Sequence, residues 1–317
     1  MTDAQVEIPV PEHLRRWHEL DPATVERGTV GFVWGNCQAE SIRRMVAPAG
    51  AAHGVEFVRL PPVFEMTEGE VDRLHELVAT AGVLVTQPVK DEYRVPGCGS
   101  EQLVALLPTD AQVVRVPTTY YEGLFPWQVH AHDADGARVD APLTDYHDLR
   151  LLRAAVDGLD VEGAVDRVLA CTPDPAAVRD LAARSQAELR RRNAALDVDT
   201  TDAVVAGGAE AMWTVNHPAN DTLRAVGAGA LAVLGWDGEP AVPDHQMLGS
   251  AKAPLDAAVL AALDLDPALA RPRWVLGGRE VPWAEVAGAQ LGLYAQRPDV
   301  ARRAVDRYAD RLAALGC

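Results

Sequence analysis

Between Thr29 and Pro117, short apolar runs alternate with amphipathic stretches, and this alternation constrains the fold more than any other feature of the chain. Short runs rich in Val, Phe and Leu predict strands, whereas apolar residues at helical spacing predict helices. The predicted strands are 29–34, 55–60, 83–87 and 112–116, and the predicted helices are 38–46, 68–80 and 101–107. Thr67 and Glu70 form a capping-box pattern at the start of the second helix. Such successive βα units predict an α/β fold with a parallel sheet of at least four strands flanked by helices, as in Rossmann-like proteins.

The second half of the chain lacks this alternation. After about Asp140 it predicts helices separated by Pro or Gly, over 161–169, 174–196, 221–234, 255–263, 283–294 and 299–315. We therefore expect an α/β domain over residues 1–148 and a mostly helical region over 149–317 packed on it. A single composite domain is the alternative.

Composition narrows the class of protein. The chain has 317 residues, 48% of them hydrophobic, which is enough for a substantial core without disulfide or metal staples. Its formal net charge of −17 argues against nucleic acid as the partner, because phosphate neutralisation needs a basic surface. Four cysteines without CxxC spacing, and the lack of a long apolar segment, predict a reduced, cytoplasmic protein that does not insert into membranes. The oligomeric state stays open.

The tetrapeptide Gly35-Asn36-Cys37-Gln38 lies between the first predicted strand and the first predicted helix. A strand-to-helix turn directs unpaired backbone N–H groups and the positive end of a helix dipole at whatever lies above it, which favours anions and thiolates. Cys37 is thus a candidate nucleophile, and the Asn36 and Gln38 side chains are candidate donors to an oxyanion. The alternative is a buried cysteine that acts as a small apolar side chain.

A thiol nucleophile needs a base, and two of the nine histidines stand in suggestive surroundings. His147 lies between Tyr146 and Asp148, and carboxylates nearby can orient an imidazole. His217 lies in Asn216-His217-Pro218, just before a predicted helix. A loop role for His147 and a turn role for His217 are the alternatives.

Two other chemistries have weaker support. His130-x-His132-Asp133 has short metal-ligand spacing, but no second cluster accompanies it, so we expect no metal. The Gly35 turn matches neither the P-loop nor the dinucleotide-binding pattern, which disfavours nucleotide hydrolysis and NAD chemistry. Cationic side chains that remain candidates for binding anionic groups are Arg43, Arg44, Lys90, Arg94 and Arg224.

Five motifs, taken in order, resemble the WcbI family of polysaccharide-biosynthesis acetyltransferases, from about residue 29 to the C-terminus. They are the strand–Gly35-Asn36-Cys37-Gln38–helix opening, Thr86-Gln87-Pro88 with Asp91-Glu92-Tyr93-Arg94, residues 117–126 (PTTYYEGLFP), Tyr146-His147-Asp148 and Asn216-His217-Pro218. The order of the five is more specific than any one of them.

The resemblance implies a coenzyme A-binding protein that moves an acetyl group onto a hydroxyl of a sugar. The family also resembles the SGNH hydrolases, in which a Gly-Asp-Ser turn after the first strand carries the nucleophile. Here Asn36 and Cys37 occupy the Asp and Ser places. A late Asp-x-x-His motif is absent, which departs from the triad of those hydrolases.

Together, these observations predict a coenzyme A-dependent acyltransferase that uses Cys37 and a histidine base, either His147 or His217. Cys37 either takes the acyl group itself or only positions the thioester for direct transfer to a hydroxyl or amine. The acceptor is a sugar, a polysaccharide precursor or a small metabolite. The expected substrate-binding residues are Asn36, Gln38, Gln87, Tyr120, Tyr121 and Asn216, and the expected coenzyme A-binding residues are Gly35, Arg43, Lys90 and Arg94. An SGNH-like esterase and a non-catalytic coenzyme A- or sugar-binding protein are the alternatives.

Overall fold

The structure, a computed structural model, describes residues 12–316. Its contacts divide the chain into two compact units. The first holds the chain up to Thr118 together with 192–200 and 223–244, and the second holds 119–191, 201–222 and the chain from His245 onward. Both units are discontinuous in sequence, in contrast to the single boundary expected near residue 148.

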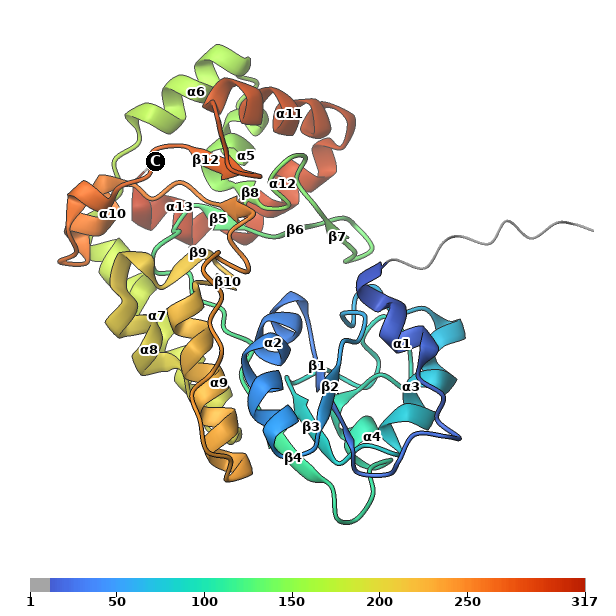
Figure 1. The fold of residues 1–317 in the computed structure, drawn as a ribbon. Helices are drawn as coiled ribbons and strands as arrows, with labels where there is room; N and C mark the ends of the chain where they lie inside the picture. The colour runs from blue at the N-terminus through green and yellow to red at the C-terminus, as the bar shows by residue number, and fades with distance from the viewer. Residues whose placement is uncertain (1–11, 317) are drawn as a thin grey trace, which may run out of the picture. The chain divides into compact units, whose positions relative to one another are not determined.

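The first unit is built on a four-stranded parallel sheet of order β2-β1-β3-β4, with helices on both faces (Figure 1). The predicted α/β class is confirmed. Its elements, in chain order, are η1 (Glu12–Leu14), α1 (Arg15–Glu19), β1 (Val30–Trp34), α2 (Cys37–Ala52), β2 (Glu56–Val58), η2 (Glu68–Glu70), α3 (Val71–Val78), β3 (Val83–Thr86), α4 (Ser100–Val104) and β4 (Gln112–Arg115). The part of α9 (Asn220–Leu234) from Leu223 also belongs to this unit.

Strand β1 is buried along its whole length, which explains its uninterrupted apolar sequence. Alternate side chains point to opposite faces of the sheet. Val30, Phe32 and Trp34 join one core cluster with residues of α1, α3 and α4. On α2, the residues of the apolar stripe predicted from the sequence, including Ile42 and Met45, are fully buried.

Each predicted element of this unit forms, with shifted ends. Helix α2 begins one residue earlier and ends six residues later than the predicted 38–46. The predicted helix over 68–80 divides into η2 and α3, and the Glu70 carboxylate accepts hydrogen bonds from both the N–H and the hydroxyl of Thr67.

Strand β4 ends the sheet, and a later segment of the same unit covers its backbone. The Arg115 N–H donates to Asp197 Oδ2 at 2.7 Å, and the Asp197 N–H donates to the Arg115 carbonyl at 2.9 Å. Open sheet edges pair readily with other strands, so this segment protects the edge.

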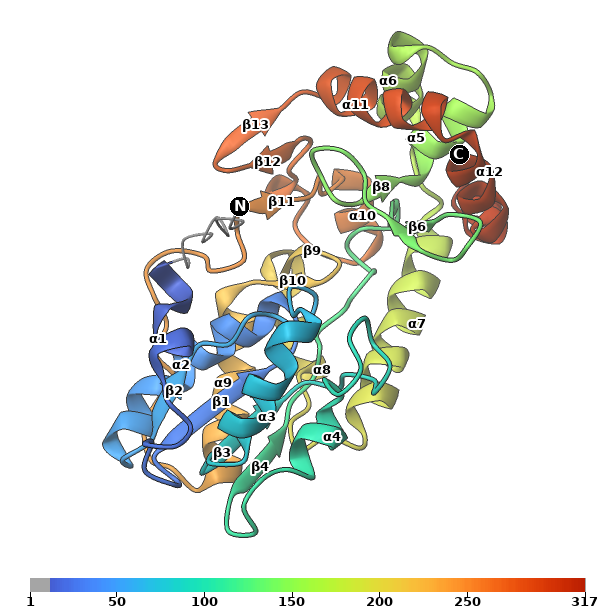
Figure 2. The ribbon, with the colours of Figure 1, turned by 90° about the vertical axis from the view of Figure 1, so that its right-hand side faces the viewer.

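The second unit is mostly helical, with short antiparallel strands (Figure 2). Its helices are α5 (Leu149–Val156), α6 (Val161–Ala170), α7 (Pro175–Asn193, extending two residues beyond the unit), α8 (Thr201–Gly207), η3 (Gly208–Glu210), α10 (Ala257–Ala262), η4 (Pro267–Leu269), α11 (Trp283–Gln296), α12 (Pro298–Arg307) and α13 (Ala309–Leu315). Its strands are β5 (Gln128–Val129), β6 (Ala131–His132), β7 (Arg138–Val139), β8 (His147–Asp148), β9 (Met212–Thr214), β10 (His217–Pro218), β11 (Ala251–Lys252), β12 (Trp274–Leu276) and β13 (Arg279–Val281).

The strands of this unit, two or three residues long, were not predicted because they carry too little periodicity, and α5 and α8 were not predicted either. The predicted helix over 299–315 is broken at Tyr308 into α12 and α13.

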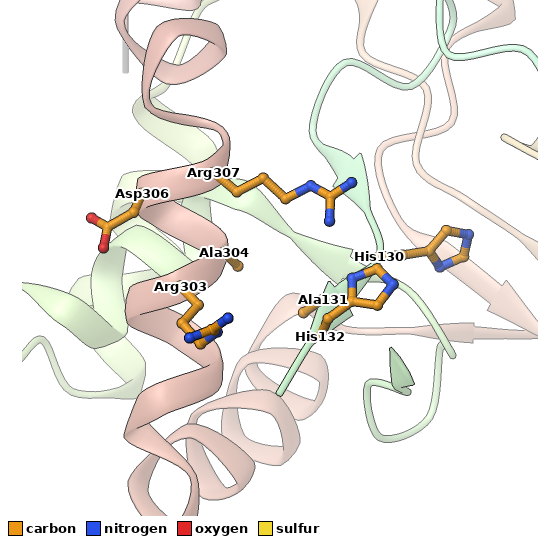
Figure 3. Close-up of a pocket in the computed structure, with 7 residues that line it drawn as sticks. All are labelled: His130, Ala131, His132, Arg303, Ala304, Asp306 and Arg307. Carbon is orange, nitrogen blue, oxygen red and sulfur yellow. The ribbon is translucent and has the colours of Figure 1, made fainter. Parts of the chain in front are cut away.

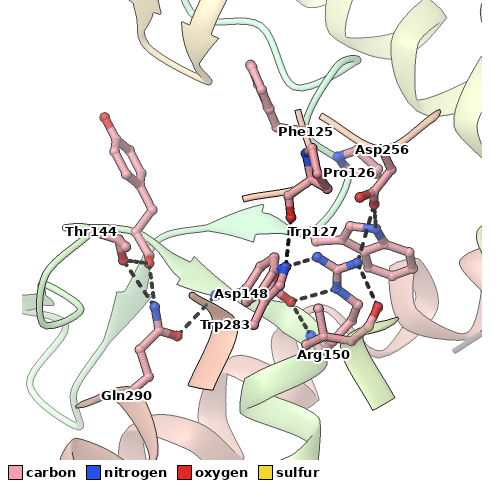
Figure 4. A network of polar contacts seen from close by, with 12 residues as sticks. Phe125, Pro126, Trp127, Thr144, Asp148, Arg150, Asp256, Trp283 and Gln290 are labelled. Carbon is pink, nitrogen blue, oxygen red and sulfur yellow. Dashed lines mark hydrogen bonds and ion pairs between the residues drawn. The ribbon is translucent and has the colours of Figure 1, made fainter. Parts of the chain in front are cut away.

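A buried ion-pair network fixes the start of α5 (Figure 4). Arg150 is 3% exposed, and its Nη2 lies 2.7 Å from Asp148 Oδ2 while its Nη1 lies 3.3 Å from Asp256 Oδ2. Its guanidinium also lies over the rings of Trp127 and Trp283, 5.0 and 5.3 Å from their centroids. Asp148 is the N-cap of α5, so helix capping and charge pairing share one carboxylate.

The cysteines differ in state. Among the described residues, Cys37 and Cys98 are not disulfide-bonded, and burial raises the pKa of Cys98. Cys171 is disulfide-bonded, so the expectation of reduced thiols is wrong for this residue. No helix within residues 12–316 is long and apolar enough to span a membrane.

Candidate active site

The turn between β1 and α2 makes Cys37 the first residue of a 16-residue helix. Asn36 is the N-cap, and its Oδ1 accepts a hydrogen bond of 2.9 Å from the Gln38 N–H. First-turn N–H groups of a helix lack intrahelical partners, so a helix start of this kind favours a negative charge beside it. The Cys37 side chain, on a half-buried residue, therefore lies where a thiolate is stabilised.

Gln87 holds this turn in place from the end of β3. It is fully buried, its Oε1 accepts from the Asn36 N–H at 2.9 Å, and its Nε2 donates to Gln38 Oε1 at 3.2 Å and to the Pro117 carbonyl at 3.1 Å. A Cβ on Gly35 would lie 2.1 Å from Gln87 Oε1, so the turn requires glycine there. The structure thus places Gln87 behind the turn as a positioning residue, with its amide engaged inside the protein.

The Cys37 turn also lies where the sheet changes direction. Strand β1 lies between β2 and β3, and the chain passes through α2 to β2 before it returns to β3 on the other side. Trp34 and Thr86, the last residues of β1 and β3, are paired. In open α/β sheets, ligands bind beyond the carboxyl ends of the strands at such a point. Sheet topology and helix polarity thus identify the same residues.

The cationic side chains expected to bind coenzyme A are in different states. Arg43 donates to both carboxylate oxygens of Glu40, at 2.7 and 2.9 Å, and to the Phe57 carbonyl at 2.9 Å. Arg94 is exposed and donates to the Phe64 carbonyl at 3.2 Å, and Lys90 is exposed. Arg43 therefore has an evident structural role that ties α2 to β2.

In the second unit, Asn216 and His217 join a polar and aromatic cluster. The hydroxyl of Tyr146 donates a short hydrogen bond to Asn216 Oδ1, and Thr214 Oγ1 donates to the same oxygen at 3.2 Å. The rings of Tyr146 and His217 meet edge to face, with centroids 6.1 Å apart. The β9–β10 pairing places Thr214 opposite His217.

Three further rings extend the cluster. The His130 ring lies 5.3 Å from that of Tyr146 and 6.4 Å from that of Tyr120, and Trp274 stacks on Tyr146 at 6.4 Å. Burial raises the pKa of Tyr120, so its hydroxyl keeps its proton at neutral pH. The cluster therefore combines imidazole, phenol and indole rings with the Asn216 and Thr214 side chains.

Burial keeps the two imidazoles of this cluster neutral. It lowers the pKa of His217 to about 4, and burial together with the nearby Arg138 lowers that of His130 to about 4. Among residues 12–316, the buried Nδ1 of each ring has no hydrogen-bond partner. A neutral imidazole with an uncommitted nitrogen can accept a proton.

His147, the other predicted base, is in a different environment. Its ring is 1% exposed, with Nδ1 2.7 Å from the Tyr294 hydroxyl and Nε2 2.8 Å from the Val139 carbonyl. Burial lowers its pKa. The carboxylate expected to orient it, that of Asp148, instead pairs with Arg150. Both ring nitrogens of His147 are therefore engaged inside the protein.

Tyr121 also faces the interior. It is buried, its hydroxyl bonds with Gln186, and burial raises its pKa. Tyr120 and Tyr121 are adjacent, and only Tyr120 borders the His130 ring. The sequence could not separate the two, because both fit a loop.

Sequence reasoning missed Tyr146 and Thr214. Tyr146 belongs to the Tyr146-His147-Asp148 motif, in which only the histidine was a candidate for catalysis. Successive residues of an extended segment point to opposite sides, so only one of the pair can face Asn216. Strand periodicity was the available signal, and the two-residue β8 was too short to show it.

The weak metal motif has a different arrangement from a metal centre. Asp133 lies 3.6 Å from Arg297 in an ion pair. Across the described part of the chain, no group of three or more His, Cys, Asp or Glu side chains is placed to hold a metal ion.

The buried imidazoles predict acid sensitivity of the second unit. A folded-state pKa of about 4, against an ordinary 6.5, means that only the unfolded chain takes up these protons between pH 6.5 and 4. Stability is thus fully present above pH 6.5 and falls as the pH falls through this window, by about 3 kcal/mol per imidazole.

Urea unfolding at pH 7 and pH 4.5 measures this loss. His217→Gln should lose less stability on acidification than the unchanged protein. His245→Gln, at an exposed position of the same unit, should lose as much stability as the unchanged protein. Equal acid sensitivity of His217→Gln would contradict the prediction.

The fold and the Cys37 turn define an open α/β protein with a cysteine at the switch point of its sheet. The family described as "Polysaccharide biosynthesis enzyme WcbI" matches residues 30–239, and the chain belongs to this family. No curated protein matches the chain.

A solved structure of WcbI, described as a novel polysaccharide biosynthesis enzyme, shares the fold with a TM-score of 0.74. It is 20% identical, and the match covers 91% of this chain and 98% of that one. That structure is described as the native protein without a disulfide bond between coenzyme A and one of its cysteines.

Proposed function

We propose that the protein is a coenzyme A-dependent acyltransferase, with acetyl the expected group, that acts on a hydroxyl or amine of a sugar, polysaccharide precursor or small metabolite. The observation that carries the proposal is the position of Cys37, a cysteine outside any disulfide at the first residue of α2. WcbI, the relative with the same fold, is described in terms of coenzyme A and a cysteine, and this supports coenzyme A as the donor here.

The chemistry has two forms. In the first, the Cys37 thiolate attacks the thioester carbonyl, the carbon–sulfur bond to coenzyme A breaks, and the released thiolate takes up a proton. The acceptor then attacks the acyl carbon on Cys37 and gives its proton to the histidine. The bond between the acyl carbon and the Cys37 sulfur breaks, and Cys37 is released as the thiolate. In the second, the acceptor attacks the thioester directly while the Cys37 turn stabilises the oxyanion.

Of the two candidate bases, we favour His217. A base needs a free nitrogen lone pair. Both nitrogens of His147 have partners, whereas Nδ1 of His217 has none among residues 12–316. Burial lowers the pKa of His217, so the ring is neutral at physiological pH, which is the form that a general base needs.

The test is incubation with acetyl-CoA. Intact-mass analysis should show one acetyl group on Cys37, or free coenzyme A should be released only when an acceptor is present. If a broad panel of sugar and amine acceptors gives neither the adduct nor the release of coenzyme A, the proposal of acyl transfer is contradicted. Hydrolysis of an aryl acetate that depends on Cys37, without transfer, would instead indicate an esterase.

Asn36 allows the oxyanion role to be separated from helix capping. Its Oδ1 accepts from the Gln38 N–H, so its Nδ2 points away from that bond, and within residues 12–316 this nitrogen makes no hydrogen bond. Asn36→Asp keeps the cap but removes the donor, so we expect activity to fall about 100-fold or more with stability nearly unchanged.

Two companion variants complete the measurement. Asn36→Ser keeps a capping oxygen without added charge and separates charge from donor loss. Asn36→Ala removes both functions and should also lose about 1 kcal/mol of stability. Wild-type turnover by Asn36→Asp would exclude a donor role for this side chain.

A further inference from the structure

A hollow in the second unit lies between β6 and α12, well separated along the chain from any residue assigned a role above except His130. Its volume is about 310 Å³, and its lining residues are His130, Ala131, His132, Arg303, Ala304, Asp306 and Arg307 (Figure 3). The space exceeds what a single small ion needs, so it can hold an anionic group with part of the molecule that carries it.

All but one of the polar residues that line the hollow are basic, and the exception is Asp306. Arg303 and Arg307 are four residues apart, so they project from the same face of α12. Figure 3 shows the Arg307 guanidinium extending toward the strand that carries His132, whereas the Asp306 carboxylate lies on the other side of the helix. Two guanidinium groups and two imidazoles thus border one space.

These arginines have no carboxylate partner. Within residues 12–316, neither Arg303 nor Arg307 takes part in an ion pair, although the chain carries a net charge of −17. Arg311, one turn beyond Arg307, pairs with Glu122 at 2.8 Å. Fork-shaped guanidinium groups left without carboxylates are typical of sites for phosphate or carboxylate ligands.

Two acids near the hollow are already neutralised by other arginines, unlike Asp306 on its lining. Asp133, next to His132, pairs with Arg297 at 3.6 Å, and Asp140 pairs with Arg138 at 2.5 Å. The Nδ1 of His132 is buried and has no hydrogen-bond partner in the described part of the chain. An anion in the hollow would therefore meet the two arginines without displacing an existing ion pair.

We propose that the hollow between β6 and α12 is a binding site for a phosphoryl group, held by Arg303, Arg307 and His132. The two forked guanidinium groups, with the His132 ring beside them, match the tetrahedral display of oxygens on a phosphate ester or diphosphate. The group belongs either to coenzyme A or to a nucleotide-linked sugar, which present the same chemistry. The site concerns binding alone and does not depend on the acyl transfer proposed above.

The experiment is titration calorimetry of the full-length protein with inorganic pyrophosphate at low salt. Arg303→Gln and Arg307→Gln should each weaken binding about tenfold. Arg302→Gln removes the same charge from the adjacent position of α12, which borders a different hollow, and should bind as the unchanged protein does. Arg303→Lys and Arg307→Lys keep the charge without the fork and should give intermediate losses.

Further titrations identify the source of the phosphoryl group. Coenzyme A, its 3′-dephospho form and a uridine diphosphate sugar are each titrated into the same variants. A loss confined to coenzyme A assigns the hollow to its 3′-phosphate, and a loss confined to the nucleotide sugar assigns it to the acceptor. A loss for pyrophosphate alone still supports a phosphoryl site, but for another ligand. If Arg303→Gln and Arg307→Gln bind each probe with the same affinity as Arg302→Gln, the proposal is overturned, whether or not acyl transfer is found.

Discussion

Replacing Cys37 with alanine is expected to lower acetyl transfer from acetyl-CoA by at least about 1,000-fold if the thiol carries the acyl group. The reason is that no other group at the start of α2 can form the thioester intermediate. The measurement is the initial rate of acceptor-dependent coenzyme A release, together with intact-mass analysis of the protein. Coenzyme A affinity, measured separately, should change little.

The size of the loss distinguishes the two mechanisms. Direct transfer would be supported if the transfer rate of Cys37→Ala falls only about tenfold and the unchanged protein shows no acetyl adduct. Cys37→Ser keeps the shape of the turn and tests whether a hydroxyl can replace the thiol. Alkylation offers an internal control, because buried Cys98, whose pKa is raised, should react far more slowly than Cys37 in the folded protein. Unchanged transfer by Cys37→Ala would exclude this cysteine from the chemistry.

The second large effect concerns stability. Replacing Arg150 with alanine leaves the Asp148 carboxylate buried without its cation, and this is expected to destabilise the second unit by about 3–5 kcal/mol. For a unit of this size, the melting temperature should fall by about 10 °C. Differential scanning calorimetry measures the change.

Arg153→Ala is the matched control. Arg153 lies on the same helix, but its ion pair with Asp157 is exposed, so the variant should lose less than about 1 kcal/mol. In the double variant Asp148→Asn/Arg150→Met both charges are absent, and stability should recover in part. A melting temperature of Arg150→Ala within 2 or 3 °C of the unchanged protein would show that the network contributes little.

The fold of the first unit was predictable because its elements carry strong periodic signals. A strand such as β1, buried on both faces, is a continuous apolar run, and α2 has an apolar stripe of Ile42 and Met45 at helical spacing. The second unit was less predictable. Its short strands pair through contacts distant in sequence, such as β5 with β8, and no local pattern encodes them.

In the candidate site, too, some residues were predictable from the sequence and others were not. Cys37 and Asn36 were identified because a strand-to-helix turn is a local feature with a known physical consequence. The role of Gln87 depends on its approach to Gly35, and that of Tyr146 on its bond to Asn216. Both contacts span more than 50 residues, so neither could be inferred from spacing.

The covering of strand β4 by Asp197 has a consequence for synthesis on the ribosome. The sheet is complete in sequence at Arg115, but the segment that covers its edge emerges about 80 residues later, and Leu223–Asp244 of the same unit later still. At about 5–20 residues per second, the edge strand stays uncovered for several seconds. During that interval the nascent chain offers an open strand to its neighbours on a polysome, so the yield of folded protein should depend on translation rate and chaperone supply. A fragment that stops after Pro117 would retain this exposed edge permanently.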